Sequence, residues 1–239
     1  MIKFSIFIIL FFGLCAHADN CAKDLAANHD EYRNFADLKR HEKEGADFKI
    51  EIRRNESPVT IIGPHAGKIE FGTSEIARAI AKTDFNLYLF EGIKDGENFG
   101  MHITSANFDE PQAVALVTRS RIAISIHGYN DEQNSLVILG GLNRPLTAEL
   151  AQAFKKSGLA VEYPAQRFKG VHSSNIVNRA GEKGVQIEIS SRLRHELLFN
   201  RNRLNHFAEA VRKAIFDYIE SDWCPQSDLN THRIAPTTP

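Results

Sequence analysis

The chain has 239 residues, with 29 basic and 30 acidic side chains and a formal net charge of −1 at pH 7. Because the charges are nearly balanced and no basic block occurs, the composition argues against binding to nucleic acid or to an anionic membrane surface. A chain of this length can build one sizeable hydrophobic core and is short for two domains.

Residues 1–18 have the pattern of a secretory signal peptide. Lys3 supplies a positive start, residues 4–14 are an almost unbroken apolar run, and Ala16 and Ala18 offer small side chains at positions −3 and −1 of a cleavage site. The apolar run is shorter than the roughly 20 residues that span a bilayer. We therefore expect a secreted or periplasmic protein that has no membrane association after cleavage. Residues 19–239 are then expected to form a single catalytic α/β domain with a loose C-terminal tail.

Two cysteines, Cys21 and Cys224, remain after removal of that segment. An exported protein meets an oxidising environment, so these residues are better interpreted as a disulfide bond than as metal ligands. Such a bond would join the mature N-terminus to the segment after the last predicted helix. The alternative is a pair of free thiols.

Hydrophobic periodicity and turn residues predict an alternation of strands and helices. The predicted strands cover residues 48–52, 59–62, 85–90, 122–126, 136–139, 159–163 and 185–189. The predicted helices are a peripheral one within 25–45, others at 73–80, from 109–111 onward and at 146–158, and a long one at 195–221. Several strands are apolar enough to be covered on both faces. The pattern therefore predicts an α/β three-layer sandwich with a mixed, largely parallel sheet.

Histidines and carboxylates follow the ends of these predicted strands. One apolar run stops at a Gly-Pro turn and is followed by His65 and Glu70, and another ends on His127. In open α/β sheets, ligands bind outside the carboxyl ends of the strands. A catalytic zinc ion takes three protein ligands and keeps one open position for water, so these residues are candidate ligands. The alternatives are histidines with structural hydrogen bonds, and Glu91 as the carboxylate ligand in place of Glu70.

Glu188 lies in the middle of the last predicted strand, between two isoleucines. A buried carboxylate is costly unless it is paired, so it needs a metal, an arginine partner or a catalytic task. From the residues alone, two roles for Glu188 remain open: a catalytic base, or the ion-pair partner of Arg192 or Arg194. Upstream, Asn178 and Arg179 are candidates for holding a substrate carboxylate, because guanidinium matches two oxygens; the alternative is an ordinary exposed loop pair.

Several segments, taken in order, resemble the zinc-dependent poly-γ-glutamate hydrolases first associated with bacteriophages. The matching segments are PHAGKIEFGTSE at 64–75, HITS at 102–105, FDEP at 108–111, SIHG at 125–128, LGG at 139–141, NIVNR at 175–179 and GVQIEIS at 184–190. The resemblance covers roughly residues 59–214, which is most of the chain after the predicted signal. Linked motifs in a fixed order are much more specific than any one of them.

The resemblance implies a zinc-carboxypeptidase-like α/β fold and one zinc ion per chain. The implied ligands are His65, Glu70 and His127, with Glu188 as the catalytic carboxylate. Asn178 and Arg179 are implied to lie in the substrate cleft. One departure is that the spacing from His65 to Glu70 is longer than the His-x2-Glu motif of the wider zinc carboxypeptidases.

The function implied by the resemblance is hydrolysis of γ-glutamyl amide bonds in a polymer such as poly-γ-glutamate or in a peptide. Two other functions stay open. A zinc peptidase or deacylase would act on peptidoglycan stem peptides or N-acyl amino acids, which present a similar amide. A non-catalytic exported zinc-binding protein would gain nothing from a buried carboxylate base such as Glu188.

Overall fold

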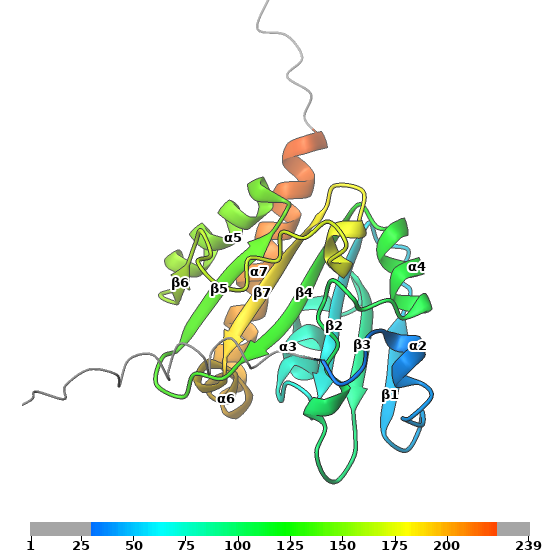
Figure 1. Cartoon of the computed structure of the whole chain (residues 1–239). Helices are drawn as coiled ribbons and strands as arrows, with labels where there is room; N and C mark the ends of the chain where they lie inside the picture. The colour runs from blue at the N-terminus through cyan, green and yellow to red at the C-terminus, as the bar shows by residue number, and fades with distance from the viewer. Residues whose placement is uncertain (1–29, 224–239) are drawn as a thin grey trace, which may run out of the picture. The chain divides into compact units, whose positions relative to one another are not determined.

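Seven strands form one mixed sheet in the computed structural model, which describes residues 30–223 (Figure 1). The strands are β1 (Phe48–Arg53), β2 (Val59–Gly67), β3 (Asn86–Gly92), β4 (Ile122–Tyr129), β5 (Leu136–Gly141), β6 (Ala160–Glu162) and β7 (Gly184–Ser190). Their order across the sheet is β1-β3-β2-β4-β7-β5-β6. Strands β3, β2, β4 and β7 run parallel, whereas β1 and β5 are antiparallel to β3 and β7. The predicted α/β class with a mixed, largely parallel sheet is confirmed.

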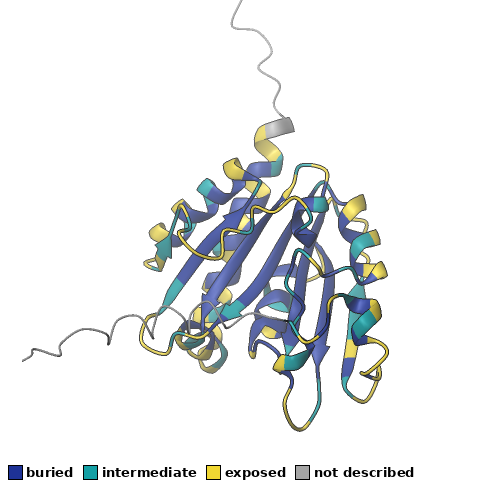
Figure 2. Cartoon of the chain, viewed as in Figure 1, coloured by how far each residue is buried: buried dark blue, intermediate teal, exposed yellow. Residues whose placement is uncertain are grey.

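Helices cover both faces of this sheet. The helical segments are α2 (Phe35–Leu38), α3 (Thr73–Ala81), η1 (Phe99–Met101), α4 (Pro111–Arg119), α5 (Arg144–Lys156), η2 (Ile176–Arg179), α6 (Ser191–Phe199) and α7 (Arg201–Trp223). Helices α3, α5, α6 and α7 enclose one hydrophobic core against the sheet, and α2, α4 and η2 enclose a second core on the opposite face. In Figure 2 the central strands are buried, the edge strands β1 and β6 are partly exposed, and the helices expose their outer sides, as in a three-layer sandwich.

The alternation of side chains along β4 explains where the functional residues point. Ile124 and Ile126 belong to the core under α3, α5 and α7. Because successive side chains point to opposite faces of a strand, His127 projects toward the other face. In the register of the parallel pair, His127 lies opposite Glu188 of β7, so both side chains stand on that face.

Two predicted helices differ in the structure. The long helix predicted at 195–221 is two helices, α6 and α7, that meet at Asn200, which has an extended backbone (φ −131°). Its side chain accepts a hydrogen bond from the amide of Arg203, as an N-cap asparagine does. The peripheral helix predicted within 25–45 is limited, in the described residues, to the short α2. The charged residues after Leu38 offer no apolar stripe that could pack.

Some predictions concern segments outside the described residues. These are the signal segment 1–18 and both cysteines of the predicted disulfide bond, Cys21 and Cys224. Among the helices that the structure does describe, none combines the length and the apolar character needed to cross a membrane.

Candidate metal centre

Three side chains of metal-ligand type meet near the carboxyl ends of β2 and β4. His65 lies late in β2, Glu70 lies in the turn between β2 and α3, and His127 lies near the end of β4. The turn closes through a hydrogen bond of 2.9 Å from the Glu70 amide to the His65 carbonyl. It needs glycine at Gly67, where φ is +68° and a Cβ atom would stand 2.6 Å from the Gly92 carbonyl oxygen.

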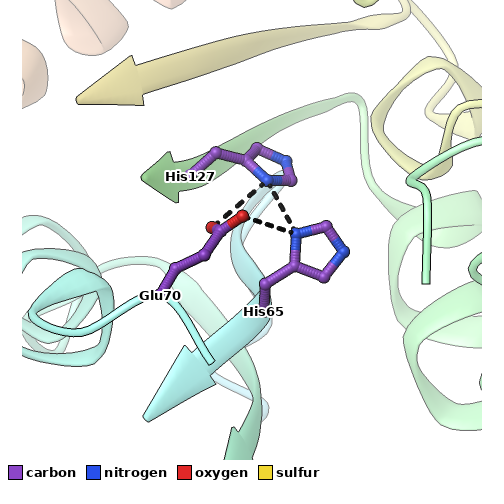
Figure 3. A group of neighbouring side chains, drawn as sticks. All are labelled: His65, Glu70 and His127. Atoms are coloured by element: carbon purple, nitrogen blue, oxygen red, sulfur yellow. Dashed lines mark hydrogen bonds and ion pairs between the residues drawn. The ribbon is translucent and has the colours of Figure 1, made fainter. Parts of the chain in front are cut away.

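The candidate ligand atoms face one another (Figure 3). His65 Nδ1 lies 3.1 Å from Glu70 Oε1 and 3.1 Å from His127 Nδ1, and His127 Nδ1 lies 3.6 Å from Glu70 Oε2. All three residues are buried. Ligand atoms from the three lie within 4.8 Å of one another, and in residues 30–223 no other group of His, Cys, Asp and Glu meets this condition.

Hydrogen bonds behind the ligands fix which atoms face the centre. His65 Nε2 lies 2.7 Å from the carbonyl oxygen of Ile103. A carbonyl oxygen only accepts, so Nε2 carries the proton of the neutral ring and Nδ1 keeps its lone pair. On the other histidine, His127 Nε2 lies 3.4 Å from Ser105 Oγ, which positions the ring; a hydroxyl can donate or accept, so this contact is compatible with a proton on Nε2 and a lone pair on Nδ1. Glu70 Oε2 accepts from the Gly128 amide at 2.8 Å.

This arrangement fits a divalent metal ion. His65 Nδ1 presents a lone pair and Glu70 an anionic carboxylate, and a neutral His127 with its proton on Nε2 adds a second lone pair. Such acceptors repel one another unless a cation lies among them. Two neutral histidines and one carboxylate are a ligand set that zinc uses in catalytic sites. The contacts with the Ile103 carbonyl, the Ser105 hydroxyl and the Gly128 amide correspond to the outer contacts that orient metal ligands.

The electrostatics of His65 and Glu70 favour the protonation states that bind a metal. Burial lowers the pKa of His65 to about 4, and the neighbouring ring of His102 adds to this shift. His65 is therefore neutral near pH 7. Burial alone would raise the pKa of Glu70, but interactions with His65 and His127 hold it well below its usual range. Glu70 is therefore ionised. At His127, burial lowers the pKa, but the charges of Glu188 and Glu70 outweigh this and raise it above its usual value, so a metal must displace a more readily held proton there.

Glu188 lies beside the three candidate ligands. It neighbours His127 across the parallel strands β4 and β7 and is 6% exposed. Its Oε1 accepts a hydrogen bond of 2.8 Å from Gln186 Nε2. Burial raises the pKa of Glu188 to about 7, against the opposing effect of His127. A carboxylate whose pKa lies near neutrality is suited to general acid and base catalysis.

Glu91, the alternative ligand, lies outside this group. Both of its carboxylate oxygens accept from Arg78 Nη2 at 2.9 Å, and Oε2 lies 3.2 Å from Lys49 Nζ. Two cations therefore satisfy its charge. The structure places Glu70, and not Glu91, with the two histidines.

The two arginines considered as partners of Glu188 have other contacts. Arg192 forms an ion pair of 3.2 Å with Glu196. The guanidinium of Arg194 donates to the carbonyl oxygens of Phe71 at 2.8 Å and Ile189 at 2.7 Å. In the described part of the chain, neither forms an ion pair with Glu188.

Asn178 and Arg179 lie in η2, and their side chains brace the backbone. Asn178 Nδ2 donates to the carbonyls of Gly170 at 2.7 Å and His172 at 2.9 Å, and its Oδ1 accepts from the Leu142 amide at 3.2 Å. Arg179 is half-buried and donates through Nε to the Ser174 carbonyl at 3.2 Å. The predicted contact of both residues with a substrate carboxylate stays a prediction.

Several groups that support the site were not assigned a role from the sequence. Gln186 stands two residues before Glu188 in the same strand, so period-two alternation could have placed it on the same face. The Ile103 carbonyl has no side-chain signal and could not have been found. His102 belongs to the HITS segment of the resemblance, but its contact with His65 depends on the tertiary fold: the two rings pack at a tilt of 34° with centroids 3.9 Å apart.

The fold and this site define an α/β protein with a buried His/Glu/His group and an adjacent carboxylate at the carboxyl ends of parallel strands. Residues 32–221 match the family model for poly-gamma-glutamate hydrolase. The chain belongs to this family of hydrolases.

Similar proteins and solved structures are consistent with this family assignment. The UPF0714 protein YndL of Bacillus subtilis is 36% identical over 197 residues, which cover 80% of this chain and 75% of that one. The structure is similar to that of a bacteriophage poly-gamma-glutamate hydrolase, with a TM-score of 0.77 and 34% identity over 81% of this chain and 100% of that one. It is also similar to zinc-free apo YndL, with a TM-score of 0.72 and 32% identity over 82% of this chain and 100% of that one.

Proposed function

We propose that this chain is a secreted or periplasmic zinc-dependent amidohydrolase that cleaves γ-glutamyl amide bonds, such as those of poly-γ-glutamate. One zinc ion per chain is held by His65, Glu70 and His127. The observation that carries the proposal is the convergence of three buried ligand atoms beside the carboxylate of Glu188. Family membership supports the substrate class, and the zinc-free apo form of a relative supports the identity of the metal. The pattern of residues 1–18 supports export.

The chemistry divides between the metal and the protein. Zinc at this site supplies a Lewis acid that polarises the amide carbonyl and lowers the pKa of water. Glu188 accepts a proton from the attacking water and transfers it to the leaving nitrogen. Gln186 donates to Glu188 Oε1 and so orients the carboxylate, which leaves Oε2 for the proton transfer. The Ile103 carbonyl keeps the proton of His65 on Nε2 throughout.

Arg179 is proposed to bind a carboxylate of the substrate. It uses only Nε in its contact with Ser174, so its two Nη groups remain for a bidentate contact with two oxygens. Asn178 is proposed to act with it indirectly, by holding the backbone at Gly170 and His172.

The test is hydrolysis by the purified chain after removal of its metal and after restoration of zinc. The expected result is that the chelated protein is inactive on poly-γ-glutamate and that about one equivalent of zinc restores activity. Product masses should show chains that end at γ-linked glutamate. Hydrolysis that survives complete metal removal would contradict the zinc mechanism. Cleavage of muropeptides or N-acyl amino acids, but not of poly-γ-glutamate, would contradict the proposed substrate.

A further inference from the structure

A cation in the segment between β6 and η2 has no role in the proposed chemistry. Figure 1 shows this segment crossing the front of the sheet, on the side opposite α7. Within it, the exposed side chain of Arg167 stacks on two aromatic rings. Its guanidinium carbon lies 4.7 Å from the ring centroid of Tyr129 and 5.4 Å from that of Phe168. These two rings lie 5.5 Å apart, so they hold the guanidinium against a fixed platform.

The backbone under this platform is held in a strained conformation. Phe168 has φ +51°, which non-glycine residues rarely adopt. Gln186 Nε2 donates to the Phe168 carbonyl at 3.3 Å, and the Gly141 amide donates to the Lys169 carbonyl at 2.9 Å. A Cβ atom at Gly140 would stand 2.5 Å from the Lys169 carbonyl oxygen. Gly140 therefore lets the segment lie directly on β5, and strain that is fixed in this way is typical of functional sites.

The same contacts place Arg167 beside the reacting groups. Gln186 Nε2 donates both to Glu188 and to the backbone of Phe168, the residue after Arg167. Tyr129 follows His127 by two residues in β4, so both side chains stand on one face about 7 Å apart. In a γ-linked glutamate chain, only the short glutamyl side chain separates each amide carbonyl from an α-carboxylate. A carboxylate of the bound substrate therefore falls within reach of this cluster.

The charge of Arg167 is not paired within the described part of the chain. Arg167 is exposed and forms no ion pair there, while Tyr129, which is 6% exposed as a residue, lies under its guanidinium. The two carboxylates nearby are satisfied elsewhere. Asp131 accepts from the amides of Gln133 and Asn134 within its own turn, and Glu162 accepts from the amide of Gln166. An external anion is the partner that this arrangement fits.

We propose that Arg167 binds an α-carboxylate of the substrate next to the cleaved bond, so that it determines specificity for acidic over neutral γ-linked chains. This inference rests on the proposed hydrolysis of γ-glutamyl bonds. It adds a cation, distinct from Arg179, that recognises the charge of the polymer.

The test compares two γ-glutamyl oligomers, one with free α-carboxylates and one with α-carboxamides. The variant is Arg167→Met, which keeps an apolar side chain on the aromatic platform and removes the charge. We expect kcat/KM on the acidic oligomer to fall about 10- to 100-fold, mainly through KM, with little change on the neutral oligomer. The preference of the wild-type enzyme for the acidic oligomer should shrink accordingly. Arg167→Lys should recover part of it, because ammonium keeps the charge but lacks the guanidinium fork.

Arg119→Met is the matched control. Arg119 is an exposed cation at the end of α4, before β4 begins, and so lies at the opposite end of the parallel strands. This variant should keep the wild-type preference. An unchanged preference in Arg167→Met, or an equal loss on both oligomers, would overturn the inference while the proposed hydrolase stands. If the wild-type enzyme cleaves neither oligomer nor poly-γ-glutamate, the proposed function itself fails.

Discussion

At the scale of single residues, the metal centre depends on which ring nitrogen of each histidine faces inward. The Ile103 carbonyl fixes the tautomer of His65 from behind, and the Ser105 hydroxyl is the corresponding group behind His127. A histidine whose outer nitrogen lacks a partner is free to rotate and to bind a proton at the wrong atom. We therefore expect the zinc affinity of the proposed site to depend partly on residues that do not touch the metal.

Removing the Ser105 hydroxyl should weaken zinc binding without unfolding the protein. We expect the Kd for zinc of Ser105→Ala to rise about tenfold, which is the lower end of the effect of such outer contacts. Competition with a chromophoric chelator measures this directly. Ser157→Ala, at the end of α5, removes a hydroxyl that donates to the Ala153 carbonyl and is the control that should keep wild-type affinity. Equal affinity in wild type and Ser105→Ala would show that the contact does not orient His127.

The buried carboxyl group of Glu188 makes the stability of the metal-free protein depend on pH. Burial raises its pKa in the folded state to about 7 from a usual value of 4.5. The folded state thus holds the proton more tightly than the unfolded state. The stabilisation from this group is complete below about pH 4.5 and is lost as the pH rises through about 7. Glutamine imitates the protonated form at every pH.

The metal-free variant Glu188→Gln should therefore gain stability over metal-free wild type as the pH rises. We expect similar melting temperatures near pH 5 and a clearly higher melting temperature for the variant near pH 8. Thermal unfolding of both proteins in the presence of a chelator measures the difference. A difference in melting temperature that stays constant across this range would contradict the buried, proton-binding state of Glu188.

At the scale of secondary structure elements, close backbone contacts around the end of β5 position the segment that carries Arg167. Gly141 has φ +103°, and a Cβ atom there would stand 2.2 Å from the Gly184 carbonyl oxygen. The neighbouring atom is backbone in a central strand and cannot move aside. This contact is the physical reason for glycine at position 141, as the contact with the Lys169 carbonyl is at position 140.

Gly141→Ala should destabilise the protein far more than an alanine at an unobstructed glycine with positive φ. Gly158, with φ +73° and no atom within 4 Å of a Cβ, is the matched control. We expect Gly158→Ala to cost about 1 kcal/mol from backbone strain alone, and Gly141→Ala to cost several times more. Urea unfolding of both variants measures the two costs. Similar midpoints would mean that β5 and β7 can separate slightly without penalty.

The sequence predicted most elements, because their periodicity and caps are local properties. The helices predicted at 73–80 and 146–158 are present as α3 and α5. The break between α6 and α7 was missed, because the apolar stripe continues past Asn200 and only its capping contact reveals the interruption. The antiparallel direction of β5 could not be predicted from local sequence patterns. It is set by pairing with β7, which comes much later in the chain.

At the scale of the whole molecule, the site joins segments that only the sheet brings together. The order β2-β4-β7 puts the ends of three strands side by side, which gathers His65, His127 and Glu188 from distant parts of the sequence. This gathering could be predicted from the rule for parallel strand ends. The packing around the site could not be predicted, because the Ile103 carbonyl, the His102 ring and Arg167 all come from loops whose paths depend on tertiary contacts.

Because the ligands come from separate segments, zinc binding should stabilise the whole fold. Only the folded chain presents all three ligands, so free zinc at about a hundredfold excess over Kd should add about 2.7 kcal/mol of stability. Differential scanning fluorimetry with and without zinc detects the rise in melting temperature. His127→Ala should lose most of this response. A response to zinc that is equal in both proteins would place the bound metal elsewhere.

The predicted disulfide bond concerns residues outside the described region and is independent of the site. A bond between Cys21 and Cys224 closes a long loop, so reduction should lower the melting temperature while leaving zinc content and turnover nearly unchanged at room temperature. Labelling of thiols in the unreduced, denatured protein tests the premise. Two labelled cysteines per mature chain would disprove it.

The proposed chemistry is tested most directly by the zinc content and turnover of Glu188→Gln on poly-γ-glutamate, measured in the same preparation beside wild type. The expected result is about one zinc ion per chain in both proteins, with kcat lower by about 10²- to 10⁴-fold in the variant, because the base is lost while the ligands remain. A variant that binds zinc and hydrolyses the polymer at nearly the wild-type rate would contradict the assignment of Glu188 as the base.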